Sequence, residues 1–349
     1  MLNNHKINST SVDLIRICAI FSVIIIHTCS VPFKSYSENF IIFGSISSFT
    51  RWCVPVFFML TGALLITKEE PISVFFKKRA TKIIIPLIAW SYIYIVFAKF
   101  FSHLDPLHAN PSVFTNPLLL LKYPAYFHLW FLYAIVSVYI AIPFLRSAFS
   151  NYNNTIALYV VALWFVSTSM IPYLNASGIP TPSLYLIKFN IIADYVGMGL
   201  LGLLLIKNIN RFSFTLSIAI FVFGFISTAY LTLISSIDKA SELYQGYTSP
   251  NVIIMSVGAF LVIYKIGERL ANNNLCKLIK LLGGLSFGIY LSHMIIMPLV
   301  WRMPFMSNEH VTHSNYPILS TFISAFCTLT ISALLSFLLS KTPLIKKIV

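Results

Sequence analysis

Charged residues are scarce in this sequence. Only 10% of its 349 residues are Asp, Glu, Lys or Arg, whereas 58% are hydrophobic and the mean hydropathy is +0.83. A soluble domain carries about 25% charged residues, so this composition excludes an ordinary soluble protein. Ten membrane-spanning helices of about 20 residues with short loops would occupy nearly the whole length. We therefore expect an all-α integral membrane protein with a single domain over 1–349.

Paired cysteines and soluble-enzyme motifs are also missing. The five cysteines form no Cys-x-x-Cys pair and no zinc-ligand spacing, which is typical of small buried residues and argues against a disulfide framework or a metal site. GxSxG, Walker and HExxH motifs do not occur, so the chemistry of those enzymes is not indicated. No small-residue cleavage site follows the apolar segment 12–31, which we interpret as a retained span rather than a signal peptide.

Long apolar runs predict ten transmembrane helices, and the basic residues predict their orientation. Most of the 24 Lys and Arg residues fall in every second loop. By the positive-inside rule these loops and both termini face the cytoplasm. The net charge of +14 thus follows from topology and gives no reason to expect a nucleic-acid partner. The predicted spans are 12–33, 45–67, 83–101, 127–147, 155–175, 187–206, 212–236, 250–269, 282–302 and 317–340.

Two ionisable residues, Arg16 and His27, interrupt the first apolar run. Eleven positions of an α-helix give roughly 16 Å of rise and about three full turns. Both side chains should therefore lie on one face, with Arg16 at the cytoplasmic end and His27 toward the outer half. Ionisable groups inside a membrane helix are costly and usually functional. The alternative is an anchoring arginine and a structurally satisfied histidine.

A basic segment at 68–82 follows the second span and includes Arg79 and Lys82. Its mixture of apolar and basic residues is typical of a short helix lying at the membrane surface. Such a helix either anchors lipid headgroups or holds a polyanionic ligand, because clustered Lys and Arg bind phosphates. Both interpretations remain open from the composition of the segment.

Further polar residues interrupt other predicted spans. Arg51 is expected at the outer opening of the second span, and His128 with Trp130 at that of the fourth. If spans one, two, four and nine are neighbours, their bases would face one cavity. Asp194 in the sixth span would then pair with one of these bases, or else belong to a structural ion pair. The predicted outer loops hold histidines without metal-ligand spacing, so we interpret them as solvated. The bases in question are His27, Arg51, His128 and His293, and Tyr290 lies near His293.

Five short pieces of the sequence form a set that spans nearly the whole chain. They are Asp13-Leu14-Ile15-Arg16 followed by His27; Arg51 with 54–62; 78–82 before Ile85-Pro86; His128-Leu129-Trp130-Phe131-Leu132; and 287–293. In this order they resemble the acyltransferase-3 family of membrane-bound acyltransferases. Two positions depart from the family pattern. Thr61 replaces a common Ser and keeps the hydroxyl, whereas Lys82 replaces a common Arg and loses its bidentate fork.

The resemblance implies an enzyme of the bacterial cytoplasmic (inner) membrane, an O-acetyltransferase in the simplest case. It implies acetyl-CoA or another acyl-CoA as cytoplasmic donor, with no permanently bound cofactor. The acceptor would be a hydroxyl of a surface glycan or an undecaprenyl-linked saccharide at the membrane lipid. The chain looks most similar to short enzymes that O-acetylate bacterial surface polysaccharide, such as enterobacterial common antigen.

The resemblance also implies roles for individual residues. His27 would be catalytic, either as a general base or as a nucleophile that forms an acyl-imidazole. Spacing and charge placement lead us to expect Arg16, Arg79 and Lys82 at the donor, and Asp13 and Asp194 as structural or charge partners. The residues implied at the acceptor or the oxyanion are Arg51, His128, Trp130, Tyr290 and His293.

Two other classes of protein share some of these features. A transporter or flippase of a lipid-linked saccharide would also have many spans and basic phosphate contacts, but it does not need the Arg-x10-His pair. A sensor or structural membrane protein would have little reason to keep so many ionisable residues within spans. The sequence therefore favours the enzyme.

Overall fold

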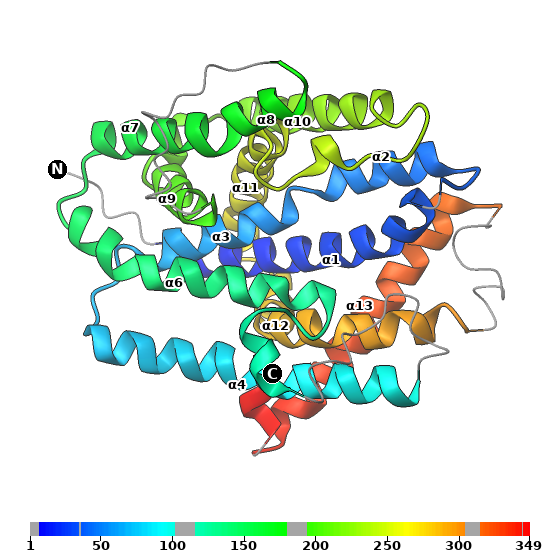
Figure 1. Ribbon diagram of the computed structural model, residues 1–349. Helices are drawn as coiled ribbons and strands as arrows, with labels where there is room; N and C mark the ends of the chain where they lie inside the picture. Colours follow the sequence, from blue (N-terminus) through cyan, green and yellow to red (C-terminus); the bar gives the residue numbers. More distant parts are fainter. Residues whose placement is uncertain (1–6, 35, 102–115, 180–193, 304–314, 344) are drawn as a thin grey trace. The chain divides into compact units, whose positions relative to one another are not determined.

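The computed structural model describes residues 7–34, 36–101, 116–179, 194–303, 315–343 and 345–349 (Figure 1). Within these ranges the regular structure is helical and no strand occurs. The main helices are α1 (Ser9–Lys34), α2 (Phe40–Thr50), α3 (Cys53–Leu65), α4 (Ile72–Phe100), α6 (Trp130–Ala148), α7 (Asn154–Trp164), α8 (Ile171–Ala176), α9 (Asp194–Lys207), α10 (Phe214–Ile234), α11 (Pro250–Leu270), α12 (Leu275–Val300) and α13 (Pro317–Lys341).

Apolar runs that start at polar caps or prolines account for these helices. Asn8 caps the start of α1, because its Oδ1 accepts hydrogen bonds from the backbone amides of Thr10 (2.9 Å) and Ser11 (3.2 Å). These amides would otherwise lack partners at the helix start. Pro250 and Pro317 begin α11 and α13, where a proline needs no amide partner and already has a helical φ.

Nine helical segments within the described residues are long and apolar enough to cross a membrane. They match nine of the ten predicted spans, with ends that differ by up to eleven residues. The predicted span 187–206 is described only from Asp194, where α9 starts, and its first residues lie outside the described ranges. The prediction of an all-α transmembrane bundle is confirmed, and the chain is a multi-pass membrane protein.

The second span differs from its prediction. It starts at Phe40 and is divided into α2 and α3 at Arg51 and Trp52, so Arg51 lies inside the span and does not open it. Residues 40–50 are themselves apolar enough to form a helix. The amide of Arg51 then donates to the carbonyl oxygen of Ser48 (3.4 Å), a tightened final turn that ends α2.

The basic segment differs as well. The predicted separate surface helix is wrong, because α4 continues without a break from Ile72 to Phe100. Residues 72–82 are therefore the first turns of the third span. Pro71 stands at the N-cap of α4, and a continuous helix satisfies the backbone groups that a break near the membrane would leave without partners.

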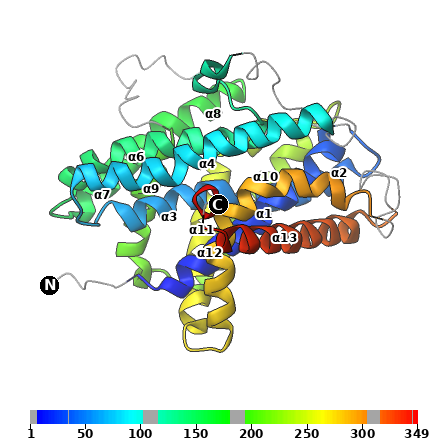
Figure 2. The ribbon, with the colours of Figure 1, turned by 90° about the horizontal axis from the view of Figure 1, so that it is seen from below.

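The helices divide into two compact units. Unit 1 comprises Met1–Lys68 and Ala141–Gly283, and unit 2 comprises Glu69–Ile140 and Gly284–Val349. In unit 1, α10 packs on α11, α3 packs on α9, and α1 contacts α2, α3 and α11 (Figures 1 and 2). In unit 2, α4 contacts the short C-terminal helix η10 (Ile345–Ile348).

Glycine allows the close approach of α3 and α9 in unit 1. A Cβ atom at Gly62 would collide with the backbone of Gly199, and one at Gly202 with the backbone of Met59. Small residues permit such backbone contact between membrane helices, where packing replaces the hydrophobic effect as the driving force. This contact holds α3 against α9.

Candidate functional site

One face of α1 carries both residues that the first span was expected to align. Since α1 is a continuous helix from Ser9 to Lys34, Arg16 and His27 lie on the same face, roughly 16 Å apart along the axis. Arg16 Nη1 donates to Asp13 Oδ1 at 3.0 Å. Asp13 packs against Gly283, where any side chain would collide with it. The carboxylate therefore orients the guanidinium, which stays 36% exposed.

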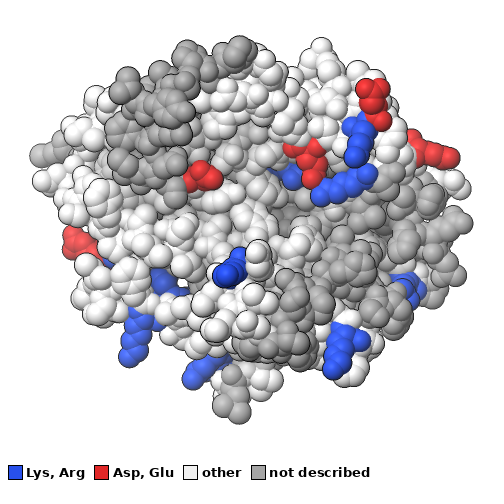
Figure 3. Space-filling view, in the orientation of Figure 1, with Lys and Arg blue, Asp and Glu red and all other residues white. Residues whose placement is uncertain are grey.

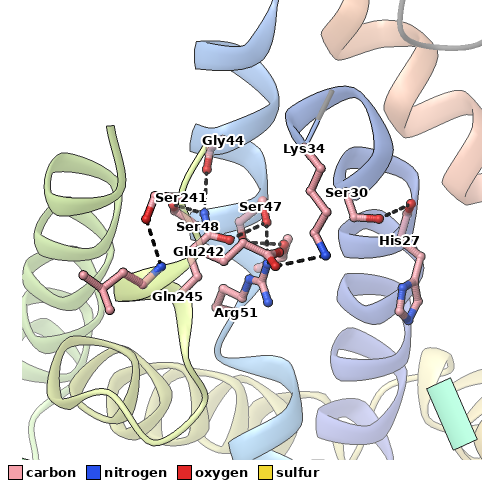
Figure 4. A network of polar contacts seen from close by, with 12 residues as sticks. His27, Ser30, Lys34, Gly44, Ser47, Ser48, Arg51, Ser241, Glu242 and Gln245 are labelled. Carbon is pink, nitrogen blue, oxygen red and sulfur yellow. Dashed lines mark hydrogen bonds and ion pairs between the residues drawn. The ribbon is translucent and has the colours of Figure 1, made fainter. Parts of the chain in front are cut away.

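His27 lies farther along this face and is half-buried. The hydroxyl of Ser30 donates to the backbone carbonyl oxygen of His27 at 3.1 Å (Figure 4). Between Arg16 and His27 the face is apolar, since Ile20 and Val23 are buried. Lys34 lies seven positions beyond His27, at the end of α1, about two turns and roughly 10 Å along the axis, and its side chain extends toward Glu242 (Figure 4).

Lys34 belongs to an ionic cluster with Arg51 and Glu242, which we call the Lys34–Glu242–Arg51 cluster. Arg51 Nη2 donates to Glu242 Oε1 at 2.7 Å and to the hydroxyl of Ser47 at 3.3 Å. Lys34 Nζ lies 3.0 Å from Glu242 Oε2. The guanidinium also lies over the ring of Tyr247, 5.8 Å from its centroid. One carboxylate thus joins cations from α1 and from the α2–α3 junction (Figure 4).

The three members of this cluster differ in exposure. The side chain of Arg51 is 10% exposed, whereas Glu242 is 36% and Lys34 59% exposed. Figure 3 shows acidic and basic side chains gathered in the upper right of the face that it draws. Burial alone would raise the pKa of Glu242, but the charges of Arg51 and Lys34 outweigh it and hold that pKa below its usual range. Glu242 is therefore ionised at neutral pH.

Gln245 fastens the loop between α10 and α11, which also carries Glu242, to α2. Gln245, which is buried, accepts a hydrogen bond from Ser47 (3.0 Å) and donates to the hydroxyl of Ser48 (3.1 Å) and the carbonyl oxygen of Gly44 (3.5 Å). Figure 4 shows these bonds beside the ionic cluster. The loop is therefore held by neutral hydrogen bonds as well as by charge.

A second ionic cluster lies in unit 2, at the start of α4, and we call it the Lys78–Glu70–Arg79 cluster. Glu70 Oε2 is 3.1 Å from Lys78 Nζ, and Glu70 Oε1 is 3.5 Å from Arg79 Nη2. The guanidinium of Arg79 lies over the rings of Phe75 (5.1 Å) and Tyr139 (5.7 Å). Arg79 is thus turned into the protein.

Lys82, the other residue expected from this segment to bind the donor, is exposed. Arg79 and Lys82 therefore have different surroundings, although they are one turn apart on α4. A lysine at an exposed position presents a mobile point charge, whereas Arg79 is fixed by a carboxylate and two rings.

The expected acceptor residues of unit 2 form a buried aromatic cluster. The ring centroids of His128 and His293 are 5.1 Å apart and nearly perpendicular. Tyr290 donates from its hydroxyl to the backbone carbonyl oxygen of His128 at 2.7 Å, and Tyr94 donates likewise to Leu291 at 2.7 Å. These bonds fix the short turn η3 (Phe127–Leu129) and α4 against α12.

The hydrogen bond of His293 determines which ring nitrogen carries its proton. Its Nδ1 lies 2.6 Å from the backbone carbonyl oxygen of Tyr290. A carbonyl oxygen only accepts, so Nδ1 carries the proton and Nε2 of the neutral ring is an acceptor. Trp130 starts α6 and is half-buried, with its ring 6.3 Å from that of Phe131.

The structure brings together some of the predicted residues and separates others. His128, Tyr290 and His293 meet in unit 2, while His27 and Arg51 lie in unit 1, so the cavity expected to join them stays a prediction. Asp194, expected as the internal carboxylate, is exposed at the start of α9, where its backbone carbonyl oxygen accepts from Trp164 Nε1 (3.1 Å).

The carboxylate that pairs with Arg51 is instead Glu242, which the sequence analysis missed together with Lys34 and Glu70. Glu242 lies 191 positions from Arg51, in a loop that was treated as solvated. The only local signal was that acidic residues are few, with 10 in the whole chain, so each buried base has few candidates for a partner.

Metal ligands do not gather in the described part of the chain, where no group of three His, Cys, Asp or Glu side chains is arranged to hold an ion. The histidines at positions 103, 108, 310 and 313 of the predicted outer loops lie outside the described residues. Their interpretation as solvated stays a prediction.

The fold and the site define a multi-pass helical membrane protein that carries an arginine and a histidine on one face of its first span. The family model Acyl_transf_3, described as an acyltransferase domain, matches residues 9–339. The chain therefore belongs to this acyltransferase-domain family. The match includes both compact units.

A curated relative is similar over a shorter stretch. The chain is 31% identical over 184 residues to an amino-acid racemase of Enterococcus faecalis, a match that covers 49% of this chain and 25% of the racemase. The chain thus spans a quarter of the length of that relative, and racemisation does not transfer to it. No solved structure matches the chain.

Proposed function

We propose that this acyltransferase transfers a short acyl group, acetyl in the simplest case, from cytoplasmic acyl-CoA to a hydroxyl of a surface or lipid-linked glycan at the bacterial inner membrane. The observation that carries the proposal is the arrangement on α1, a continuous helix that has Arg16 and His27 on one face and Lys34 at its end. A donor that enters beside Arg16 and an acceptor that arrives at the opposite end would meet near His27.

The donor end of α1 has the properties that a polyphosphate requires. Arg16 is oriented by Asp13 at 3.0 Å but remains accessible, so its other N–H groups are available to bind a ligand. Arg groups bind phosphates through paired, charge-assisted hydrogen bonds. Lys82, which is exposed, and Arg79 are proposed to supply further positive charge for the donor. The extended pantetheine arm would then cover the roughly 16 Å to His27.

His27 would act as the general base of the transfer. Its imidazole takes the proton of the acceptor hydroxyl while the oxygen attacks the thioester carbon. The carbon–sulfur bond then breaks, and the imidazolium returns the proton to the departing thiolate of CoA. In a second mechanism the imidazole attacks the thioester itself and carries the acyl group to the hydroxyl. Arg51, His128, Trp130, Tyr290 and His293 are proposed to orient the acceptor or stabilise the oxyanion.

Substitution of His27 tests this proposal. His27→Ala should reduce transfer from radiolabelled acetyl-CoA to the membrane glycan fraction by about 10²- to 10⁴-fold, the usual contribution of a general base. Ser30→Ala is the matched control, because it lies on the same helix and removes only a hydrogen bond to the backbone. Wild-type transfer by His27→Ala would reject the role of His27.

The two mechanisms separate in a rapid-quench experiment. Acyl-imidazole chemistry predicts a burst of protein-bound label that is stable in acid only briefly and disappears in His27→Gln. Direct attack by the hydroxyl predicts transfer without bound label. Mass spectrometry of the surface glycan with and without the protein then identifies the acceptor and the acyl group.

A further inference from the structure

We propose that Lys34 and Arg51 form a recognition site for an acidic group on the acceptor, a carboxylate or a phosphate, and that Glu242 occupies this site as the resident counter-ion. The identification of the ligand as the acceptor rests on the proposed function. The site itself rests on the geometry of the Lys34–Glu242–Arg51 cluster.

Glu242 shows how the site would hold such a group. Each oxygen of its carboxylate takes one cation, Arg51 at 2.7 Å and Lys34 at 3.0 Å. Carboxylates and phosphates share this arrangement of two accepting oxygens, and charge-assisted hydrogen bonds to them are stronger than neutral ones. A ligand group that displaces the carboxylate would meet the same two cations, which come from separate elements of unit 1.

Arg51 has hydrogen-bonding capacity that Glu242 does not use. Its guanidinium carries five N–H donors, and the bonds to Glu242 and to Ser47 both start from Nη2. Its Nε atom is buried and makes no hydrogen bond within the described ranges of the chain. A buried donor without a partner is costly, so a larger anion would be stabilised by a group that Glu242 leaves unsatisfied.

A purely structural role explains the ion pairs less well. In that role they would only attach the loop between α10 and α11 to α1 and α2. Gln245 already binds α2 through three hydrogen bonds. The hydroxyl of Tyr36 donates to the carbonyl oxygen of Ile237 at 2.6 Å on the other side of Glu242. With anchors on both sides, the half-exposed carboxylate adds little to the attachment, since ion pairs at water-exposed positions contribute roughly 0–1 kcal/mol.

The position of the cluster fits the geometry of transfer. Lys34 lies about two turns beyond His27 along α1, at the end predicted to point away from the cytoplasm. An acceptor whose acidic group is bound there would place a neighbouring hydroxyl toward His27. The net charge of the cluster, two cations and one anion, favours negatively charged ligands over neutral ones.

Binding of small probes to the purified protein in nanodiscs tests the proposal without an acyl donor. The probes are methyl β-D-glucuronide for a carboxylate, glucose 1-phosphate for a phosphate, and methyl β-D-glucoside as the neutral match. Isothermal titration should show tighter binding of one acidic probe than of the glucoside. The tighter of the two acidic probes identifies the source of the anion, sugar or phosphate carrier.

A ligand site and a purely structural ion pair predict different effects of substitutions in the cluster on the affinity for the acidic probe. Glu242→Gln removes the competing carboxylate and should tighten binding of the acidic probe about threefold to tenfold, whereas Lys34→Met should weaken it about tenfold. Lys34→Arg should keep the wild-type affinity. If Glu242→Gln and Lys34→Met both weaken binding, the ion pairs only fasten the loop and the proposal is overturned.

Gln245→Ala is the control for a loosened loop, because it breaks three hydrogen bonds and changes no charge. Preference for the acidic probe should survive in this variant, and its loss would overturn the proposal, as would equal binding of acidic and neutral probes by the wild type. The binding measurement uses no acetyl-CoA. The binding result therefore stands even if the His27 experiment fails to show acetyl transfer. Equally, the transfer result stands if the acidic probes do not bind.

Discussion

The two ionic clusters, one in each unit, are built from the same groups in different surroundings. In both, one Glu joins one Arg and one Lys, and the Arg lies over aromatic rings. Glu70 is 6% exposed and pairs with residues of the adjoining helix, whereas Glu242 is 36% exposed and pairs with residues about 200 positions away.

The difference in exposure of the two carboxylates indicates which cluster is able to exchange its anion. A carboxylate that is buried beside a buried guanidinium is costly to remove, because the cation left behind has neither water nor a partner. A half-exposed carboxylate is replaced by water or by another anion at little cost. We therefore interpret the Lys78–Glu70–Arg79 cluster as a brace for the start of α4 and the Lys34–Glu242–Arg51 cluster as a site that ligands enter.

The largest expected effect is on stability. Glu70→Gln should lower the free energy of unfolding by about 3 kcal/mol, because the carboxylate position is closed to the water that could replace it beside Arg79. At the more exposed position of Glu242 water can replace the carboxylate beside Arg51, so Glu242→Gln should cost less than about 1 kcal/mol. Thermal or denaturant unfolding in detergent measures both. Glu69→Gln, an exposed neighbour, should leave stability unchanged. Equal losses for Glu70→Gln and Glu242→Gln would remove the distinction between the clusters.

The next effect separates donor from acceptor binding. Lys82→Met should raise KM for acetyl-CoA about threefold to tenfold with little change in kcat, since it removes a charge that binds the donor uniformly. Arg51→Met should leave the KM for acetyl-CoA unchanged and reduce transfer to the glycan. Lys77→Met is the control on the same helix, also exposed. An equal rise in KM for Lys77→Met would mean that positive charge acts without regard to position.

A smaller effect concerns pH. The pKa of Glu242 lies below its usual value in the folded protein, because the charges of Arg51 and Lys34 outweigh the effect of burial. The stabilisation it provides is therefore present above the unfolded pKa and is lost as pH falls through the folded one. The Tm advantage of wild type over Glu242→Gln should shrink as pH falls below about 4.3, the ordinary Glu pKa. A constant difference between pH 7 and pH 3.5 would contradict the prediction.

The smallest effect is expected at the two lysines. Lys78 is 52% exposed and Lys34 59% exposed, so Lys78→Ala and Lys34→Ala should each change stability by no more than about 0.5 kcal/mol. Their consequences for ligands should nevertheless differ. Only Lys34→Ala should weaken the acidic probe, which titration of both variants would show. A large loss of stability in Lys34→Ala would place that cluster among the structural braces.

Some features of this protein could be predicted from sequence because they depend on residues close together in the chain. Runs of apolar residues predicted the spans, and a helical period of 3.6 placed Arg16 and His27 on one face of α1. The short motifs that resemble the acyltransferase-3 family are also local, and the family model that matches 9–339 agrees with them.

Only the tertiary structure decided which residues meet. Hydropathy does not tell which loop folds onto which helix, so Glu242 was missed as the partner of Arg51, and Asp194 was expected as the carboxylate for one of the bases. The break between α2 and α3, the continuation of α4 through the basic segment, and the burial of Arg79 over the rings of Phe75 and Tyr139 likewise depend on packing. A charge within a membrane protein needs a partner wherever the fold supplies one, and sequence distance places no limit on that choice.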